Sequence, residues 1–496
     1  MRKAKATPNN QETSADLIAA SLARYKPYLS PTEFICLTQE IEQPPMPAIR
    51  ANLLKVDPIT AMPVWKHLYG WETLEIPYYP HAWQITHANV SISQTIEHRM
   101  GEYYIQDAAS MLPVALFDIS HQPGQLILDM AASPGGKTTQ LIDLTDDKSF
   151  VLANDASASR LQALRIVLQN WGATNFASTR FSGEKFGEWF PEAFDMILLD
   201  APCSMENLRT SPSHPARPTT DNERQRLATR QSNLLISAFK ALKPGGQLVY
   251  ATCTLAPEED EAVLDALLKA YPAYAGIEDV SHLGLNAPGL PIFADQVFHP
   301  DVQHALRLWP HVSGTSGFFA ARISKNSPLR TQYEPPPTRP FSATGLNPLP
   351  DHELTALCTY FEEAYGFSLD HLIESQNQDV FYRKGSVVLI PQVYLSQFQT
   401  LPYHTLGMVL GKQAPKGFIP SHEFVSRFGN EFRTGFLTIP QEFYSEWITG
   451  RDIRGYKVPS ITNGSVVVVR DLLGRNLGSG KVLADRIRNL LPARAI

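Results

Sequence analysis

The sequence predicts an α/β protein built around a doubly wound, mostly parallel sheet. Five short apolar runs between residues 125 and 253 alternate with stretches of helical periodicity, which is the pattern of parallel strands joined by crossover helices. Several of the runs stop at Asp or Cys, residue types that gather at the ligand-binding rim of such sheets. The expected strands are Gln125–Asp129, Phe150–Asp155, Phe176–Thr179, Met196–Asp200 and Leu248–Cys253. Helices are expected at Ser159–Trp171 and Leu227–Leu242, the second ended by a turn at Lys243–Gly246.

Further domains are expected in the chain before and after this sheet. The preceding part has a helical pattern at Ala15–Tyr28 and a strand-like run at Ala48–Val56. Seven prolines between Ser324 and Pro350 favour a stiff, extended linker, and helix Asp351–Tyr365 and short strands at Val387–Ile390 and Ser465–Val469 follow it. We therefore divide the chain into an N-terminal α+β domain (1–95), the doubly wound domain (96–325), the linker (326–350), a small connecting subdomain (351–403) and a C-terminal α+β domain (404–496).

Composition narrows the class of protein. Four cysteines in 496 residues are too few for a disulfide framework, so we expect reduced thiols. No apolar run approaches the ~20 residues that a membrane span needs. The first residues are basic and then polar, without the apolar core of a secretory signal. We expect a cytoplasmic protein that does not contact membranes.

The charge is unevenly distributed. The whole chain has a net charge of −6, but residues 451–496 hold nine Lys or Arg against three Asp. A basic end on an acidic body is typical of an appended phosphate-binding module. A solvated basic surface without a ligand fits the same counts, and charge alone leaves both interpretations open.

A glycine-containing turn follows the first expected strand, in the segment Leu126–Thr139. Its small residues would let backbone approach a ligand, and the helix that begins there offers free N–H groups. Asp155 ends the next strand, 26 residues after Asp129, where an acidic side chain can bind ribose hydroxyls. These features favour a nucleoside-bearing cofactor, whereas a plain structural turn and a helix-capping Asp155 remain the simpler alternatives.

A P-loop NTPase is the competing interpretation of this turn. Gly136-Lys137-Thr138 matches the end of that motif, and Ile197–Asp200 resembles its metal-binding strand. However, the first glycine of the motif would fall at Ala131, and Asp129 would repel a triphosphate. We expect no metal-ligand cluster in the chain.

Two expected strands end at cysteines. Cys203 follows Asp200 by three residues, and Cys253 ends the strand some fifty residues later. Two thiols at one rim, with a carboxylate beside them, indicate covalent chemistry on an electrophilic ring. A buried free cysteine is often only a core residue, and we apply that interpretation to Cys36 and Cys358.

The ordered motifs resemble the Nop/Sun RNA cytosine-C5 methyltransferases. The matching segments are Asp129–Thr138 (DMAASPGGKT), Asp200–Ser204 (DAPCS) and Thr252–Leu255 (TCTL), with support from Tyr104–Asp107, Arg209 with Pro212, and Gly317–Phe319. The proline-rich linker and basic end resemble the bacterial F-type branch, which acts on small-subunit ribosomal RNA and carries a PUA-like C-terminal domain. Asn476–Lys481 and Arg488–Pro492 are similar to parts of such a domain.

This resemblance implies a Rossmann-like fold, S-adenosylmethionine as cofactor, and a covalent mechanism. Cys253 would add to C6 of cytosine to make C5 nucleophilic, and Cys203 would help to eliminate it afterwards. Asp200 would contact the N3/N4 edge of the base and the methionine end of the cofactor. The implied cofactor-binding residues are Ala131, Ala132, Ser133, Pro134, Gly135, Gly136, Lys137, Asp155 on the ribose, Ser182 near the adenine amine, and Asp200.

Three positions depart from the family pattern. Ser182 stands where Asp is usual, Met205-Glu206-Asn207 replaces Gly-Glu-Gly, and Ser316 replaces Asp. The first two motivate a second hypothesis, a ribosome-assembly factor that binds RNA without methylating it.

The second thiol also separates RNA enzymes from DNA enzymes, which by resemblance would attack with Cys203. We therefore expect ribosomal RNA or the small ribosomal subunit as partner, no DNA, and a monomer. Four arginines near the thiol loop could contact RNA or simply be solvated: Arg209, Arg217, Arg224 and Arg226.

Overall fold

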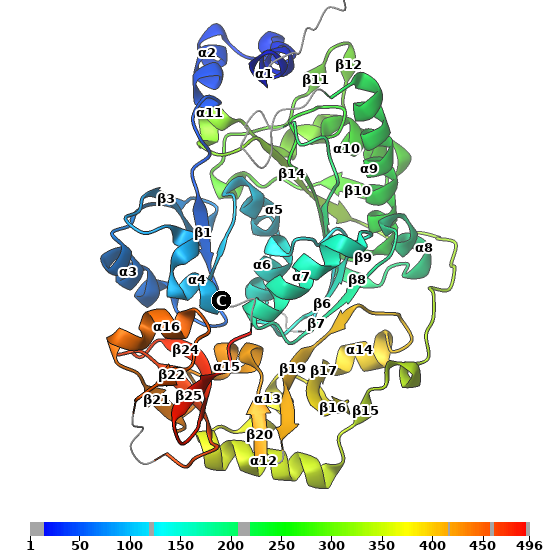
Figure 1. Cartoon of the computed structure of the whole chain (residues 1–496). Helices are drawn as coiled ribbons and strands as arrows, with labels where there is room; N and C mark the ends of the chain where they lie inside the picture. The colour runs from blue at the N-terminus through cyan, green and yellow to red at the C-terminus, as the bar shows by residue number, and fades with distance from the viewer. Residues whose placement is uncertain (1–13, 119–123, 207–218, 415–416, 457–460, 493–496) are drawn as a thin grey trace, which may run out of the picture.

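A mixed sheet of nine strands forms the centre of the computed structural model, which describes residues 14–118, 124–206, 219–414, 417–456 and 461–492 (Figure 1). Its path is β10-β14-β9-β8-β5-β6-β7-β18, and β13 pairs with β14. The five inner strands are parallel: β5 (Leu126–Asp129), β6 (Phe150–Asn154), β7 (Phe176–Thr179), β8 (Phe194–Asp200) and β9 (Leu242–Thr252). The others are antiparallel to their neighbours: β10 (Ala275–Ile277), β13 (Leu306–Leu308), β14 (Phe318–Lys325) and β18 (Thr405–Leu406).

Helices bury both faces of this sheet, and successive strand residues alternate between them. Leu128 and Leu199 belong to the core shared with Leu234 of α9, whereas Ile127 and Leu198 share a core with Leu141 of α6. A two-residue period explains why the strands read as continuous apolar runs. The helices of this region are α5 (Leu112–Ala115), α6 (Gly136–Leu144), α7 (Ala158–Trp171), α8 (Phe186–Trp189), α9 (Asp221–Ala241), α10 (Glu261–Ala270) and α11 (Pro310–Ser313).

The structure confirms the doubly wound α/β architecture and the five predicted strands, but it corrects one turn. Lys243–Gly246 lies within β9. There the register with β8 jumps from Phe194↔Leu242 to Met196↔Gln247, so extra residues bulge out of the strand. Gly245, with φ +76°, takes the backbone conformation that this bulge needs.

The N-terminal part contributes a separate antiparallel sheet with the order β2-β3-β1-β4. Its strands are β1 (Ala48–Ala51), β2 (Glu72–Ile76), β3 (Tyr79–His87) and β4 (Tyr103–Ile105), with helices α2 (Pro31–Glu40), α3 (Pro58–Tyr69) and α4 (Ile96–Met100). The expected strand at Ala48–Val56 therefore ends at Ala51, and β4 carries this sheet past the boundary expected at residue 95.

The first helix packs away from that sheet. The helical pattern expected at 15–28 forms α1 (Ser14–Ala23) and the 3-10 turn η1 (Lys26–Tyr28). Leu22 and Tyr25 share a small core with Leu255 and Trp309 of the central domain. In Figure 1, α1 accordingly lies beside the end of the central domain that carries α11 and the β11–β12 hairpin (Ile292–Phe293 and Gln296–Val297).

Two five-stranded sheets follow the central domain. The first has the order β15-β16-β17-β19-β20, from β15 (Asn347–Pro348) through β16 (Gln378–Arg383), β17 (Ser386–Pro391) and β19 (Met408–Ala414) to β20 (Gly417–Pro420). The second has the order β21-β23-β24-β25-β22, with β21 (Phe436–Thr438), β22 (Ile453–Arg454), β23 (Val466–Arg470), β24 (Asn476–Val482) and β25 (Arg486–Asn489). Their helices are α12 (Asp351–Tyr365), α13 (Leu369–Ser375), α14 (Gln392–Gln397), α15 (His422–Phe428) and α16 (Tyr444–Ile448).

The first of these sheets changes the boundaries expected from sequence. Strands on both sides of residue 403 share it, so a division there would cut through one hydrogen-bonded sheet. The proline-rich connection has no helix or strand from 326 to 340, but β15 pairs with β16, and Leu346 and Leu349 are buried. Apolar residues between the last prolines thus return the chain to a core.

Arg50 joins the N-terminal sheet to the helix that begins at the glycine turn. Its guanidinium is fully buried and donates hydrogen bonds to the Asp143 carboxylate, to Thr139 Oγ1 at 2.6 Å and to the Gly136 carbonyl at 3.1 Å. It also lies 4.5 Å from the centroid of the Trp171 ring.

We expect Arg50→Met to lower the free energy of unfolding by about 3–5 kcal/mol, because it strands a buried carboxylate that loses its partner. Denaturant unfolding measures the change. The matched control is Lys148→Met, which breaks the exposed pair with Asp146 and should change the same quantity by less than about 0.5 kcal/mol. Equal effects of the two substitutions would contradict this assignment.

Candidate functional site

A cavity of about 220 Å³ lies where the glycine turn meets the end of β4. Residues from the turn, from the segment after β4 and from the end of β8 enclose it. Its lining residues are Tyr104, Ile105, Gln106, Asp107, Ser110, Asp129, Ala131, Ala132, Ser133, Pro134, Gly136, Lys137 and Asp200. The carboxyl ends of β5 and β8 therefore supply polar groups to one cavity, as expected for ligand sites of open α/β sheets.

Two glycines make the turn that borders this cavity. Gly135 has φ +116°, and a Cβ there would lie 3.0 Å from both Leu164 Cδ1 and Val167 Cγ1. A Cβ on Gly136 would lie 2.9 Å from Tyr104 Cε1. Larger residues would thus push α7 or the Tyr104 ring aside. No side chain caps the start of α6, and its first residues, Gly136 and Lys137, line the cavity. The first N–H groups of a helix lack partners within the helix and can bind an electronegative ligand.

Buried charge is concentrated at the floor of the cavity. Asp129 accepts a hydrogen bond from Thr138 Oγ1 at 2.7 Å, and burial raises the pKa of its carboxyl to about 7. Lys137 Nζ donates to Asp200 Oδ2 at 2.8 Å. Burial disfavours the charged amine, but the charges of Asp200, Cys253 and Asp129 together raise the pKa of Lys137 above its usual value. Lys137 is therefore a cation shared by the carboxylates and the thiol region.

The two predicted cysteines meet beside this cation. Their sulfur atoms lie 3.1 Å apart, within hydrogen-bond distance, and both side chains are half-buried. The hydrogen bond to Cys253 and burial raise the pKa of the Cys203 thiol well above its usual value. Cys203 is thus held as a neutral thiol facing the second sulfur.

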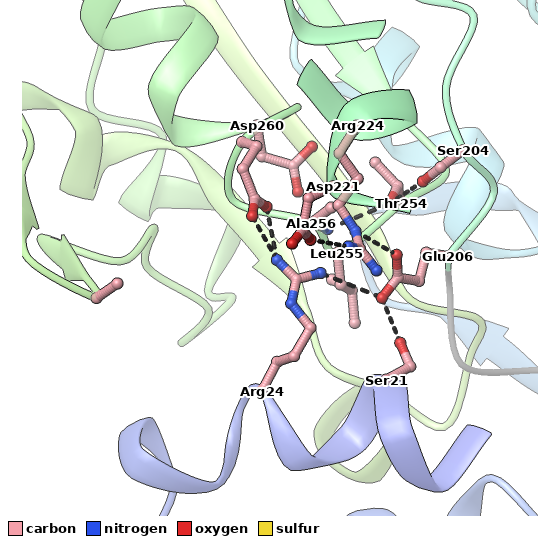
Figure 2. Close-up of polar contacts among 12 residues, drawn as sticks. Ser21, Arg24, Ser204, Glu206, Asp221, Arg224, Thr254, Leu255, Ala256 and Asp260 are labelled. Carbon is pink, nitrogen blue, oxygen red and sulfur yellow. Dashed lines mark hydrogen bonds and ion pairs between the residues drawn. The ribbon is translucent and has the colours of Figure 1, made fainter. Parts of the chain in front are cut away.

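Hydrogen bonds fix the two loops that carry the thiols. Ser204 Oγ and Thr254 Oγ1 lie 3.0 Å apart, which ties the residues that follow each cysteine (Figure 2). Glu259 Oε2 accepts from the Ser204 N–H and from Gln231 Nε2, both at 2.9 Å. The loops are therefore anchored to each other and to α9.

The structure brings most of the predicted site residues together. Of the predicted cofactor residues, Ala131, Ala132, Ser133, Pro134, Gly136, Lys137 and Asp200 line the cavity. Gly135, Asp155 and Ser182 are not among the described lining residues.

Asp155 is buried and accepts hydrogen bonds from the backbone N–H groups of Ser133 and Ser157, at 3.3 and 2.8 Å. It therefore supports the turn and the start of α7, while the helix N-cap itself is Ser157. The Ser182 hydroxyl donates to Glu184.

Some expectations about single residues change. Arg224, expected beside RNA or solvent, is 7% exposed and pairs with Glu206 at 3.0 Å, because α9 packs its first turns against the thiol loop. Arg226 is exposed on the same helix, and Arg209 and Arg217 lie outside the described residues. Sequence reasoning missed the lining role of Tyr104, Gln106, Asp107 and Ser110, although Tyr104–Asp107 belonged to the matching motifs.

Within the described ranges, no three or more His, Cys, Asp or Glu side chains are placed to hold a metal ion. The helices of that same part of the chain are all too short or too polar to cross a membrane.

Comparisons with known proteins cover nearly the whole chain. Residues 117–324 match the family described as 16S rRNA methyltransferase RsmB/F. The ribosomal RNA small subunit methyltransferase F of Aeromonas salmonicida is 31% identical, over 95% of this chain and 94% of that protein. The protein of the same name from Cronobacter sakazakii is 33% identical, over 94% and 93% of the two chains.

Solved structures agree on the fold. A methyltransferase homolog from Pyrococcus horikoshii is 30% identical with a TM-score of 0.55, and it aligns over all of its own chain and 65% of this one. NSun6 from Pyrococcus horikoshii, solved with SFG, shares the fold at 21% identity and a TM-score of 0.52, over 62% of this chain and 97% of its own.

The pKa of Asp129 generates a pH prediction. Because the folded-state pKa of about 7 lies above the ordinary value of 3.8, folding favours the protonated carboxyl. The stability that this group contributes is complete below pH 3.8 and is lost as pH rises through 7. Asp129→Asn cannot ionise, so its stability relative to wild type should rise between pH 4 and 8, by at most about 4 kcal/mol. Denaturant unfolding of both proteins across this range measures the difference, and a constant difference would contradict the assignment.

Proposed function

Because the chain belongs to the RsmB/F family of 16S rRNA methyltransferases, we propose that it methylates C5 of a cytosine in small-subunit ribosomal RNA through a covalent adduct with Cys253. The observation that carries this proposal is the pair of sulfur atoms 3.1 Å apart beside the cavity. A single pyrimidine ring extruded from its stack can reach both atoms.

S-adenosylmethionine is the methyl donor of this class of enzyme, and the residues of the cavity fit it. Asp129 Oδ1 and Ser133 Oγ are buried and lack a hydrogen-bond partner among the described residues, so the hydroxyl and amino groups of a nucleoside would satisfy them. The N–H groups of α6 and the Asp200 carboxylate offer further contacts. When bound, the donor would supply an electrophilic methyl group. We retain Gly135, Asp155 and Ser182 as proposed cofactor residues.

The two thiols have different proposed roles. A thiolate at Cys253 adds to C6 of cytosine, which leaves electron density on C5 for the methyl transfer. The Lys137 ammonium interacts with Cys253, whose charge contributes to the raised pKa of the lysine. After solvent takes the C5 proton, the electrons of that C–H bond restore the C5–C6 double bond and the bond between sulfur and C6 breaks. The neutral Cys203 thiol donates its proton to the departing Cys253 sulfur. Asp200, which accepts a hydrogen bond from Lys137, would bind the polar edge of the base.

The remaining parts fit an RNA partner. We propose that the C-terminal sheets include a PUA-like RNA-binding unit, because the sequence of residues 451–496 holds nine Lys or Arg against three Asp. Phosphate contacts would offset the few kcal/mol that base extrusion costs. We further propose a monomer that acts in the cytoplasm on ribosomal RNA or on the small subunit, and not on DNA.

Cysteine substitutions separate the two roles. Cys203→Ala should accumulate a covalent adduct with RNA, because elimination is impaired, whereas Cys253→Ala should form no adduct and no 5-methylcytosine. Denaturing electrophoresis of the protein with labelled ribosomal RNA and donor measures this. The control is Cys358→Ala, which changes a half-buried thiol in a different core. An adduct with Cys253→Ala protein would reverse the assignment.

Donor binding tests the alternative of a non-catalytic RNA-binding assembly factor, which the departures from the family pattern at Ser182 and Met205 motivate. Calorimetry with S-adenosylmethionine should show binding to wild type and a loss of at least about tenfold in affinity for Asp129→Asn, which loses an acceptor in the cavity. No detectable binding to wild type would favour the assembly factor. Bisulfite sequencing of ribosomal RNA from a deletion strain would then identify the cytosine or show that none is modified.

A further inference from the structure

At the end of the thiol loop, Glu206 binds three polar side chains, which come from α1, from the residue after α1 and from α9. Its carboxylate accepts hydrogen bonds from the Ser21 hydroxyl, from Arg24 Nη1 at 3.2 Å and from Arg224 Nε at 3.0 Å. Figure 2 shows Ser21 and Arg24 reaching from α1 and the residues just after it, and Arg224 from the opposite side. The Glu206 side chain is 8% exposed and that of Arg224 9%, so the charges are largely removed from water.

Arg24 makes a second attachment, to the loop after Cys253. Its Nη2 donates to both carboxylate oxygens of Glu258, at 2.6 and 2.7 Å. A planar guanidinium that pairs with two carboxylates fixes orientation as well as distance. Arg24 thus holds one residue from each thiol loop.

The backbone extends this attachment to the thiols. The Leu255 N–H donates to the Glu206 carbonyl at 3.0 Å, and Tyr25 Oη donates to the Leu255 carbonyl at 2.7 Å. Glu206 is three residues beyond Cys203, and Leu255 is two residues beyond Cys253. Each loop is therefore held by a hydrogen bond within three residues of its cysteine.

The loop between Cys203 and Glu206 is strained. Met205 has φ +62°, a left-handed conformation that costs a residue with a side chain about 1 kcal/mol or more and persists only where its surroundings impose it. Its side chain is 48% exposed and contributes little packing of its own. The buried contacts of Glu206 supply the restraint.

We propose that Glu206 and Arg24 are positioning residues, and that the N-terminal helix sets the distance between the two thiols by holding both loops. This proposal rests on the proposed function, in which both thiols act on one cytosine. Ser21 and Arg24 lie outside residues 117–324, which match the methyltransferase family, so the inference adds a part of the chain that the catalytic domain alone does not contain.

The rate of methylation tests this role. In the full-length protein with both cysteines present, Arg24→Ala should slow single-turnover formation of 5-methylcytosine by about 10- to 100-fold, because a small misplacement of a reacting atom has effects of that size. The dissociation constants for ribosomal RNA and S-adenosylmethionine should be unchanged. Glu206→Gln should slow the step similarly, and adding Arg24→Ala to it should give less than the product of the two effects, because the residues act through one contact.

Two further variants keep the test decisive if Arg24→Ala fails to fold. Arg24→Lys keeps the positive charge but lacks the planar guanidinium that pairs with both carboxylates, so it should give an intermediate rate. Ser21→Ala should slow the step slightly. The matched control is Lys26→Ala, which removes an exposed positive charge from the same segment, away from Glu206, and should leave the rate unchanged. An unchanged rate in Arg24→Lys and Glu206→Gln, or a loss explained wholly by weaker RNA binding, overturns the proposal. If the Cys203→Ala single variant forms no covalent adduct with RNA, the proposed function is refuted instead.

Discussion

Parallel pairing of β8 and β9 is the constraint on which the rest of the site depends. Asp200 is in register with Ala251, so the chain leaves both strands at the same height, and a few residues later the two sulfur atoms lie 3.1 Å apart. Neighbouring strands lie about 4.8 Å apart, a spacing that brings side chains from two loops to one small ring without further adjustment. The glycine turn after β5 adds the cavity on the other side of β8, because β5 and β8 are also paired in parallel.

The sequence predicted this centre well because its signals are local. Strands that are buried on both faces appear as continuous apolar runs in the sequence. The residue that ends such a run is therefore predicted to lie at the rim of the sheet. The sequence predicts that the backbone at Gly135 and Gly136 lies close to other groups, and the structure shows which side chains lie there. The role of Asp155 is the exception. Spacing placed it at the rim, but its hydrogen bonds to the turn depend on how α7 begins.

Contacts between distant segments could not be predicted in the same way. Arg224 appeared as one of several loop arginines, and only the packing of α9 against the thiol loop buries it. The same limit applied to domain boundaries. Lys55 donates to the carbonyls of Met100 and Asn170 and to Ser426 Oγ, at 2.6–2.7 Å, and so joins the N-terminal, central and C-terminal parts. Burial lowers the pKa of this lysine to about 7. Neither the composition nor the periodicity of the sequence indicates that Lys55 is buried.

The electrostatics around the two thiols distinguish one cysteine from the other. A hydrogen bond between two sulfur atoms favours one neutral donor and one acceptor, because two thiolates at that distance would repel each other. This hydrogen bond and burial raise the pKa of Cys203, which favours its neutral thiol, and the Lys137 cation interacts with Cys253. Lys137 is itself held by Asp200, the last residue of β8, and Cys203 follows three residues later in the loop that leaves this strand. A change in position of that loop would therefore alter the distance between the sulfur atoms and the placement of the cation together, and the buried contacts of Glu206 oppose such a change.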